Sequence, residues 1–305
     1  MAKKDFWDLT NKPQTKTKLN ILNNYLSAWA KIFGKQDWCK SIYYIDCFAG
    51  RGKYHNDGGL NVIDGSPLIA LKIAKIFKEK YNKKLVCYFA ENDVEVFNEL
   101  QNFADVFKTN VDFECTQGDI NNVIDNVLTK IPRGNPVFFF LDPKGINIKR
   151  ETLEKMLAIP NIKEFLINYI QKGVERCYAF GKKSDEGLPI DIQKRAVSNL
   201  KRIQDFFGSD WQYLTDNEKR NLKVYLNVIV SFNKKSSPKN QLKAKVIDIY
   251  YNKNRNKYYL IFLSRNKRAS KIIDDIYKKV KLDGTLFSIL PTKEKEKMFQ
   301  GKFDI

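Results

Sequence analysis

Residues 43–52 read YYIDCFAGRG, an apolar strand that ends at Asp46 and runs into a turn of small residues. Gly50 and Gly52 let the backbone bend tightly and approach a ligand, because glycine has no Cβ in the way. In an open α/β sheet, a turn of this kind follows the first strand, and a nucleoside-bearing ligand lies across the carboxyl end of that strand. Many strand–turn–helix units carry two glycines, so the weight of this stretch depends on the residues downstream.

Length and hydropathy favour a globular α/β protein. A chain of 305 residues can bury a large core, either as one α/β domain or as a domain with a substantial insertion. No apolar run approaches the roughly 20 residues of a membrane-spanning helix, and residues 1–7 lack the apolar core of a signal peptide. We therefore expect a soluble, cytoplasmic protein with no membrane partner.

Cysteine and histidine usage argues against several kinds of site. The five cysteines are dispersed along the chain: Cys39, Cys47, Cys87, Cys115 and Cys177. No two form a Cys-x-x-Cys pair, and several stand in apolar runs, so we expect buried, reduced thiols. With His55 as the single histidine, ligand pairs at zinc spacing are missing, and no metal site is expected. The same scarcity disfavours Ser-His-Asp and Cys-His catalysis.

Positive charge is concentrated in the last part of the chain. The net charge is +19, and residues 219–305 hold 22 Lys and Arg against 7 Asp and Glu, a net of +15. A Lys- and Asn-rich composition also arises from an AT-rich genome, but that bias does not place most of the excess in under a third of the chain. We expect a polyanionic partner, nucleic acid above all, with solvated charge or an acidic protein partner as the alternatives.

Apolar runs of strand length alternate with helical patterns up to residue 170. A polar arm over 1–18 precedes an amphipathic helix over 19–33. Strands are expected at 42–48, 85–90, 112–116, 137–141 and 164–169, and helices at 68–81, 94–107, 120–130 and 150–158. A long glycine-containing loop is expected over 53–64. This alternation predicts a parallel sheet covered by helices on both faces.

The pattern changes after residue 170. Residues 171–240 are predicted to form a mainly helical insertion, and the runs 246–251 and 258–264 flank polar turn residues, as in a hairpin. A last helix is expected over 269–279. The predicted fold is therefore α/β, with a doubly wound, mostly parallel, Rossmann-like sheet that ends in an antiparallel hairpin. Residues 19–170 and 241–305 would form this domain.

An acidic residue stands at or just past the end of each of four successive strands: Asp46, Glu91, Asp119 and Asp142. In a doubly wound sheet these ends line one crevice. Carboxylates there suit a ligand that presents amino groups, ribose hydroxyls or an adenine amine. We expect Glu91 to accept hydrogen bonds from a ribose diol and Asp119 to contact a base edge.

Two of these stretches resemble motifs of class I S-adenosylmethionine-dependent methyltransferases. Residues 46–52 resemble motif I, and Asp142-Pro143-Lys144-Gly145 resembles motif IV of the enzymes that act on nucleic-acid amino groups. More specifically, the chain looks like the three-Cys-motif partner proteins. The shared features are Tyr44-Ile45-Asp46-x-Phe48-Ala49-Gly50-x-Gly52, Gly65-Ser66-Pro67-Leu68-Ile69-Ala70-Leu71, Leu141-Asp142-Pro143-x-Gly145, the Leu-rich helix before the first strand, and the run Tyr259-Leu260-Ile261-Phe262.

The resemblance implies a methyltransferase sheet, S-adenosylmethionine as cofactor and transfer to a base exocyclic amine. The cofactor-binding residues that it implies are Asp46, Phe48, Ala49, Gly50, Gly52, Glu91 and Asp119. Asp142, Pro143 and Lys144 would form the catalytic motif, with the carboxylate and the Pro143 carbonyl accepting the hydrogens of the amine. The main contribution would be positioning and electrostatics, because the cofactor carries the reactive group.

Lys144 departs from this pattern, because an aromatic residue that stacks on the target base is common at its position. Lys144 could instead contact a phosphate, and Tyr169 could supply a ring, although a core tyrosine is the favoured interpretation. Trp7, Trp29, Trp38 and Trp211 are interpreted as core or helix-packing residues. The departure weakens the prediction of methyl transfer more than that of cofactor binding.

Two other functions stay open. One is a non-catalytic subunit on a methyltransferase scaffold, which binds nucleic acid or docks on a partner and works with a radical-SAM-like, three-cysteine-motif protein. The other is a nuclease that uses clustered carboxylates and a divalent metal, which acids spread over four strand ends fit less well. A nucleic-acid-binding cluster is expected just after the last strand, at Arg265, Lys267, Arg268 and Lys271, where it could track a phosphate backbone.

Overall fold

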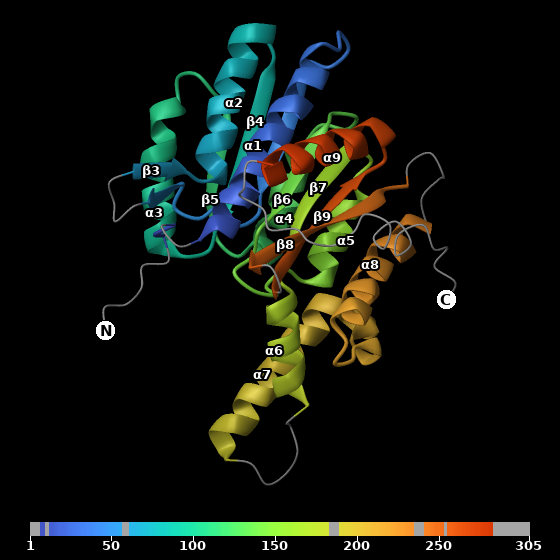
Figure 1. Cartoon of the computed structure of the whole chain (residues 1–305). Coiled ribbons are helices and arrows are strands. Elements are labelled where there is room, and N and C mark those ends of the chain that lie inside the picture. Colours follow the sequence, from blue (N-terminus) through green and yellow to red (C-terminus); the bar gives the residue numbers. More distant parts are fainter. Residues whose placement is uncertain are drawn as a thin grey trace.

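A computed structural model gives the fold of the chain (Figure 1). It describes residues 7–9, 12–56, 61–182, 189–234, 241–252 and 255–282. Among these residues, no helix is both long enough and apolar enough to cross a membrane.

A seven-stranded sheet forms the centre of the fold, in the order β5-β4-β1-β6-β7-β9-β8. Its strands are β1 (Ser41–Asp46), β4 (Lys84–Glu91), β5 (Phe113–Gln117), β6 (Val137–Leu141), β7 (Lys163–Tyr169), β8 (Lys243–Asn252) and β9 (Arg255–Ser264). The first five pair in parallel, whereas β9 pairs antiparallel with both β7 and β8. The predicted α/β class, with a doubly wound, mostly parallel, Rossmann-like sheet ending in an antiparallel hairpin, is confirmed.

Helices cover both faces of the sheet because strand side chains alternate between two apolar layers. In β1, Ile42 and Tyr44 join the core of one face, and Tyr43 and Ile45 join that of the other. The first layer contains α1 (Pro13–Gly34), α2 (Ser66–Tyr81), α3 (Val94–Ala104) with the short turn η2 (Asp105–Phe107), and α9 (Lys267–Leu282). The second contains α4 (Ile120–Thr129) and α5 (Arg150–Ala158).

Helices also make up the described part of residues 171–240. They are α6 (Gln171–Gly181), α7 (Ile190–Phe207), the 3-10 turn η3 (Gly208–Tyr213) and α8 (Glu218–Lys234). Figure 1 shows α6 and α7 as a pair that extends beyond the edge of the sheet. The pair packs closely, since a Cβ at Gly181 would stand 3.4 Å from the Cα of Leu200. The division of the chain into domains stays a prediction.

Two local predictions are wrong. The predicted arm 1–18 is partly helical, because α1 begins at Pro13, and Thr17 and Lys18 on its first turns are buried. The predicted loop 53–64 contains a hairpin of β2 (Lys53–Asn56) and β3 (Asn61–Asp64). Four-residue strands give little periodicity to detect, which explains why a loop was expected there.

The packing predictions for the cysteines and for Tyr169 hold. Cys39, Cys47, Cys87 and Cys177 are buried as free thiols, and Cys115 is partly buried. Tyr169 is a core residue, 1% exposed, so its ring belongs to the packing of the second layer.

A buried carboxylate ties α1 to the strands beneath it. Glu164 on β7 accepts hydrogen bonds from the Tyr25 hydroxyl on α1 (2.6 Å) and from the Ser264 hydroxyl at the end of β9 (2.7 Å). Burial raises the pKa of Glu164 above its ordinary value, while both hydroxyls oppose that rise by donating to the carboxylate. Removing either donor leaves part of a buried charge unsatisfied.

We expect Tyr25→Phe to lower the free energy of unfolding by about 1–3 kcal/mol, since it removes a hydrogen bond to a buried carboxylate without changing the ring. Urea titration at neutral pH measures this loss. Tyr213→Phe is the matched control, because Tyr213 is 55% exposed and should tolerate the same deletion. Equal midpoints for the two variants would show that the Tyr25 hydroxyl contributes nothing.

Candidate functional site

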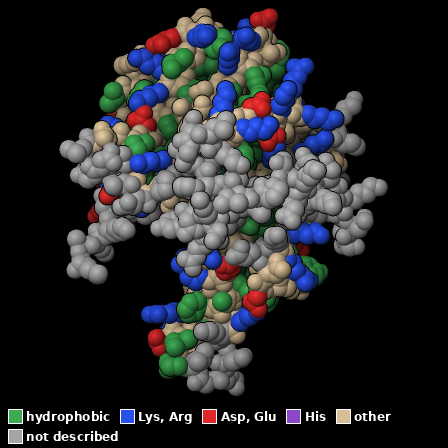
Figure 2. Space-filling view, viewed as in Figure 1, with side chains coloured by type: hydrophobic (Ala, Val, Ile, Leu, Met, Phe, Trp, Pro, Cys, Tyr) green, Lys and Arg blue, Asp and Glu red, His purple; other side chains and the backbone are tan. Residues whose placement is uncertain are grey.

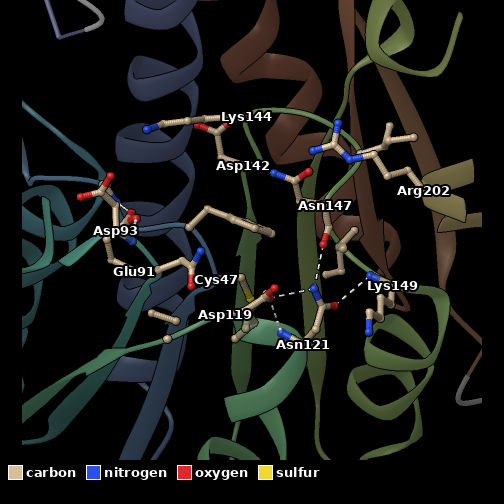
Figure 3. Close-up of a pocket in the computed structure, with 18 of the residues that line it drawn as sticks. Cys47, Glu91, Asp93, Asp119, Asn121, Asp142, Lys144, Asn147, Lys149 and Arg202 are labelled. Atoms are coloured by element: carbon tan, nitrogen blue, oxygen red, sulfur yellow. Dashed lines mark hydrogen bonds between the residues drawn. The ribbon is translucent and has the colours of Figure 1, made fainter. Parts of the chain in front are cut away.

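A cleft of about 480 Å³ opens at the carboxyl edge of the sheet. It lies where the strand order reverses, since β4 and β6 pair with opposite sides of β1. Open α/β sheets bind ligands at this switch point. Residues that follow β1, β4, β5 and β6 line it, and Arg202 and Asp205 of α7 complete its wall. Figure 3 shows these side chains converging from separate elements.

The glycine turn after β1 is held by the acid that ends β4. Gly50 has φ +66°, a left-handed conformation that favours glycine, and its N–H donates to Glu91 Oε2 (2.8 Å). Glu91 Oε1 accepts from the Asp93 N–H (3.0 Å). Glu91 therefore shapes the turn while its carboxylate still lines the cleft.

Asp46 lies beneath the turn and not in the cleft. Its side chain is fully buried and accepts hydrogen bonds from the Tyr44 hydroxyl (3.1 Å) and the Phe48 N–H (3.3 Å). Burial raises the pKa of Asp46 to about 7, against the opposing effect of a hydrogen bond from Ser66. Direct ligand contact, which the sequence suggests for Asp46, does not fit this geometry, because the residues around it satisfy its oxygens.

A side-chain network connects the ends of β5 and β6. Asp119 caps α4 and accepts from the Asn121 N–H (2.9 Å) and side-chain amide (2.8 Å). The Asn121 amide also donates to the Asn147 carbonyl, and Asn121 Oδ1 accepts from the Lys149 N–H, each at 2.8 Å. Figure 3 shows these contacts meeting at Asn121, which connects Asp119, Asn147 and Lys149. Asn121 thereby fixes the loop after β6 against α4.

Asp142, just past β6, is held from two sides. It forms an ion pair with Lys18 of α1, and its Oδ1 accepts from the side-chain amide of Asn168 on β7 (2.7 Å). Both ion-pair partners are largely shielded, with side chains 9% exposed for Lys18 and 16% for Asp142. Pro143 beside them is buried. The carboxylate is therefore fixed at the wall of the cleft.

An aromatic ring reaches the cleft from the start of the chain. Trp7 lies over the glycine turn, and a Cβ at Gly50 would stand 3.1 Å from its ring. The Lys144 ammonium lies 5.0 Å from the ring centroid of Trp7, and the Tyr54 ring is 5.4 Å away. The interpretation of Trp7 as a core or helix-packing residue is wrong. Its role could not be predicted, because nothing near it in the sequence marks it as part of the site.

The basic cluster after the last strand lies away from this cleft. Since β9 runs antiparallel to β7, its end at Ser264 lies beside the first residues of β7. Burial, with a further contribution from the charge of Arg265, lowers the pKa of Lys163, the first residue of β7, to about 8, which places Arg265 at that edge. The cluster Arg265, Lys267, Arg268 and Lys271 is therefore about one strand length, roughly 20 Å, from the carboxyl edge.

The structure brings together six of the predicted ligand and catalytic residues at the cleft: Phe48, Gly50, Glu91, Asp119, Asp142 and Lys144. Asp46, Ala49, Gly52 and Pro143 are buried and do not line it. The lining residues that the sequence reasoning missed include Trp7, Tyr54, Asp93, Asn121, Asn147, Lys149 and Arg202. Only the position of Asn121, two residues after Asp119 at a helix start, offered a signal.

No protein-family model and no curated protein matches the chain. Solved structures similar to it include a Bacillus cereus O-methyltransferase in complex with S-adenosylhomocysteine, at 10% identity and a TM-score of 0.40, over 79% of this chain and 80% of that one. A Streptomyces coelicolor geranyl diphosphate C-methyltransferase is 8% identical with a TM-score of 0.38, over 79% of this chain and 78% of that one. An S-adenosylhomocysteine-bound Podospora anserina methyltransferase is 7% identical with a TM-score of 0.34, over 78% of this chain and 77% of that one. At such low similarity, the fold assignment rests on the strand order and the cleft.

The raised pKa of Asp46 predicts how the stability of the protein depends on pH. Its folded-state pKa of about 7 exceeds the ordinary value near 4, so the folded state binds more protons between these two pH values. Stability from this group is therefore fully present below about pH 4 and is lost as pH rises through 7. From pH 5 to pH 8, the wild type should lose about 1–3 kcal/mol relative to Asp46→Asn, which cannot titrate.

Urea unfolding of both proteins at the two pH values measures this difference. Asp125→Asn, at a side chain 66% exposed on α4, is the control and should follow the wild type. Parallel pH profiles for the wild type and Asp46→Asn would contradict the shift.

Proposed function

We propose that the protein binds S-adenosylmethionine and methylates an exocyclic amine of a nucleic-acid base. The observation that carries the proposal is the cleft at the switch point of the sheet, where the Gly50 turn faces the carboxylates of Glu91 and Asp119. This combination of close backbone approach and hydrogen-bond acceptors suits a nucleoside with a cationic tail.

The residues present fit that cofactor. Glu91, which ends β4, and Asp93, just past it, offer acceptors for ribose hydroxyls, and Asp119 faces the cleft from the start of α4. Glycine at position 50 lets the Trp7 ring approach the turn closely, since a Cβ there would stand 3.1 Å from that ring. When bound, S-adenosylmethionine would supply a methyl group on an electron-poor sulfonium. The carboxylates of the cleft would favour its positive charge.

Asp142 would act on the acceptor. An exocyclic amine is a poor nucleophile because its lone pair is delocalised into the ring. A fixed carboxylate that accepts one of its hydrogens, with the Pro143 carbonyl available for the other, would orient the nitrogen and take up charge as the proton leaves. Lys18 and Asn168 hold Asp142 in place for this task.

The charged rim of the cleft supports a phosphate-bearing acceptor. Lys144, Lys149 and Arg202 all line the cleft, and all three residues are exposed. Lys149 and Arg202 lie across the cleft from Glu91 and Asp93 (Figure 3), whereas the Lys144 side chain extends toward the side of Asp93, where its ammonium lies over the Trp7 ring. Arg202 belongs to the helical segment after β7, so that segment would take part in binding the acceptor. Phosphates bound by such cations give strongly salt-dependent affinity.

The charge on the surface outside the cleft supports a nucleic-acid partner less specifically than the cations that line the cleft do. Figure 2 shows Lys and Arg side chains spread over the described part of one face, with Asp and Glu among them. The excess positive charge would steer a polyanion toward the protein. The cations at the cleft, rather than those near Arg265, would position a target base.

A second candidate is a non-catalytic subunit that binds nucleic acid or docks on a radical-SAM-like partner, as membership in the three-Cys-motif partner family would imply. The observation that favours it is the ion pair of Asp142 with Lys18, because a carboxylate already paired accepts less readily from an amine. Lys144 in place of an aromatic residue points the same way.

Calorimetric titration with S-adenosylmethionine and S-adenosylhomocysteine tests the cofactor. We expect both to bind the wild type. Glu91→Ala should weaken binding about 10-fold or more, because it removes an acceptor and releases the Gly50 turn. Glu79→Ala on α2, 62% exposed, is the control and should bind as the wild type does. No heat at millimolar ligand would rule the proposal out.

Transfer of a labelled methyl group to pooled RNA and DNA tests the reaction. We expect Asp142→Asn to lower the rate about 100-fold or more and to keep cofactor binding. Circular dichroism should accompany the assay, since Lys18 loses its buried counter-charge in this variant. The second candidate would be supported if the wild type transferred no methyl group while its salt-sensitive nucleic-acid binding survived Asp142→Ala.

A further inference from the structure

The segment that carries Trp7 is anchored to the sheet domain by backbone pairing. The His55 N–H donates to the Trp7 carbonyl (2.9 Å), and the Leu9 N–H donates to the His55 carbonyl (2.7 Å). Asp8 forms a parallel bridge with His55, and Leu9 is 1% exposed in the first core layer. Residues 7–9 therefore extend the β2–β3 hairpin, which places the Trp7 ring at a defined point of the cleft.

That point lies on the acceptor side of the glycine turn. The ring contacts Gly50, Tyr54 and Lys144, and Tyr54 in turn lies close to Asp142. Burial, with Asp142, Asp46 and Glu91 nearby, raises the pKa of the Tyr54 hydroxyl, so this ring stays neutral. Trp7 and Tyr54 together form an aromatic corner next to the carboxylate that would meet the acceptor.

We propose that Trp7 is a substrate-binding residue that stacks on the planar base of the acceptor nucleotide. The inference rests on the proposed function and names the side chain that selects a flat, heteroaromatic acceptor. An indole stacks on any nucleobase, because every base has a π face. Trp7 would supply from the start of the chain the ring that position 144 lacks.

Lys144 complements this role through its contact with the same ring. An exposed cation–π contact is weaker than the stacking of a base on an aromatic side chain. An arriving base can therefore take the place of the Lys144 ammonium on the indole. The ammonium, still at the rim of the cleft, then meets the phosphate of the same nucleotide. Trp7 and Lys144 would therefore bind the base and the phosphate of one nucleotide together.

Fluorescence and affinity measurements on the full chain test the inference. With S-adenosylhomocysteine present, titration with a fluorescein-labelled single-stranded RNA or DNA tetranucleotide gives the affinity by anisotropy. Unlabelled nucleoside monophosphates report on Trp7 through quenching of tryptophan emission. We expect quenching in the wild type and in Trp38→Phe, whose deleted indole is 56% exposed, and its loss in Trp7→Phe.

The affinity series separates stacking from a structural role. Trp7→Leu should weaken oligonucleotide binding about 5- to 100-fold, and Trp7→Phe should restore part of that loss, because a smaller ring still stacks. Lys144→Met should keep the quenching. It should reduce the slope of log affinity against log salt concentration by the amount that corresponds to about one phosphate contact. Matching thermal midpoints would show that the variants fold alike.

Cofactor titrations of the same variants keep the two proposals apart. Absence of cofactor binding in the wild type would defeat the methyltransferase function, while Trp7-dependent quenching by nucleotides would still support the stacking site. Oligonucleotide affinity unchanged in Trp7→Leu would overturn the stacking role. So would a loss confined to S-adenosylhomocysteine affinity, since it would assign Trp7 to the cofactor side, or the absence of quenching at millimolar nucleotide.

Discussion

β1 lies at the centre of the sheet with β4 on one side and β6 on the other, and the cleft depends on this placement. The chain moves outward from β1 through β4 to β5 and then returns to pair β6 with the free side of β1. Its connections therefore leave neighbouring strands toward opposite faces, and a space opens between them at the carboxyl edge. The apolar side chains of β1, buried on both faces, hold this arrangement in place.

The acids at the strand ends fall into two physical classes. Asp46 is buried beneath the turn and serves the protein itself, at the cost of a raised pKa. Glu91, Asp119 and Asp142 each hold backbone or side-chain partners and also border the cleft. Fixing these carboxylates in advance lowers the reorganisation that a bound ligand would require. The same contacts that shape the site therefore also hold its carboxylates in fixed positions.

Much of the site follows from local sequence. The glycine turn, the strand that precedes it and the acids that end later strands are recognisable because each depends on a few neighbouring residues. Trp7, Asn121 and Arg202 were not predictable in the same way. Trp7 is placed by pairing with His55, and Arg202 by the packing of a helix that starts more than forty residues after β6 ends. Contacts between such distant segments leave no periodic signal in the chain.

The sequence by itself determined the doubly wound sheet, its antiparallel end and the edge at which the cleft opens, because alternation of apolar and polar residues sets burial strand by strand. The tertiary structure alone decided which charges face that edge. The antiparallel course of β9 carries Arg265 and its neighbours to the opposite edge, whereas α7 brings Arg202 to the cleft. Strand direction and helix packing assign these positions, because no local sequence pattern shows at which edge of the sheet a charged side chain will lie.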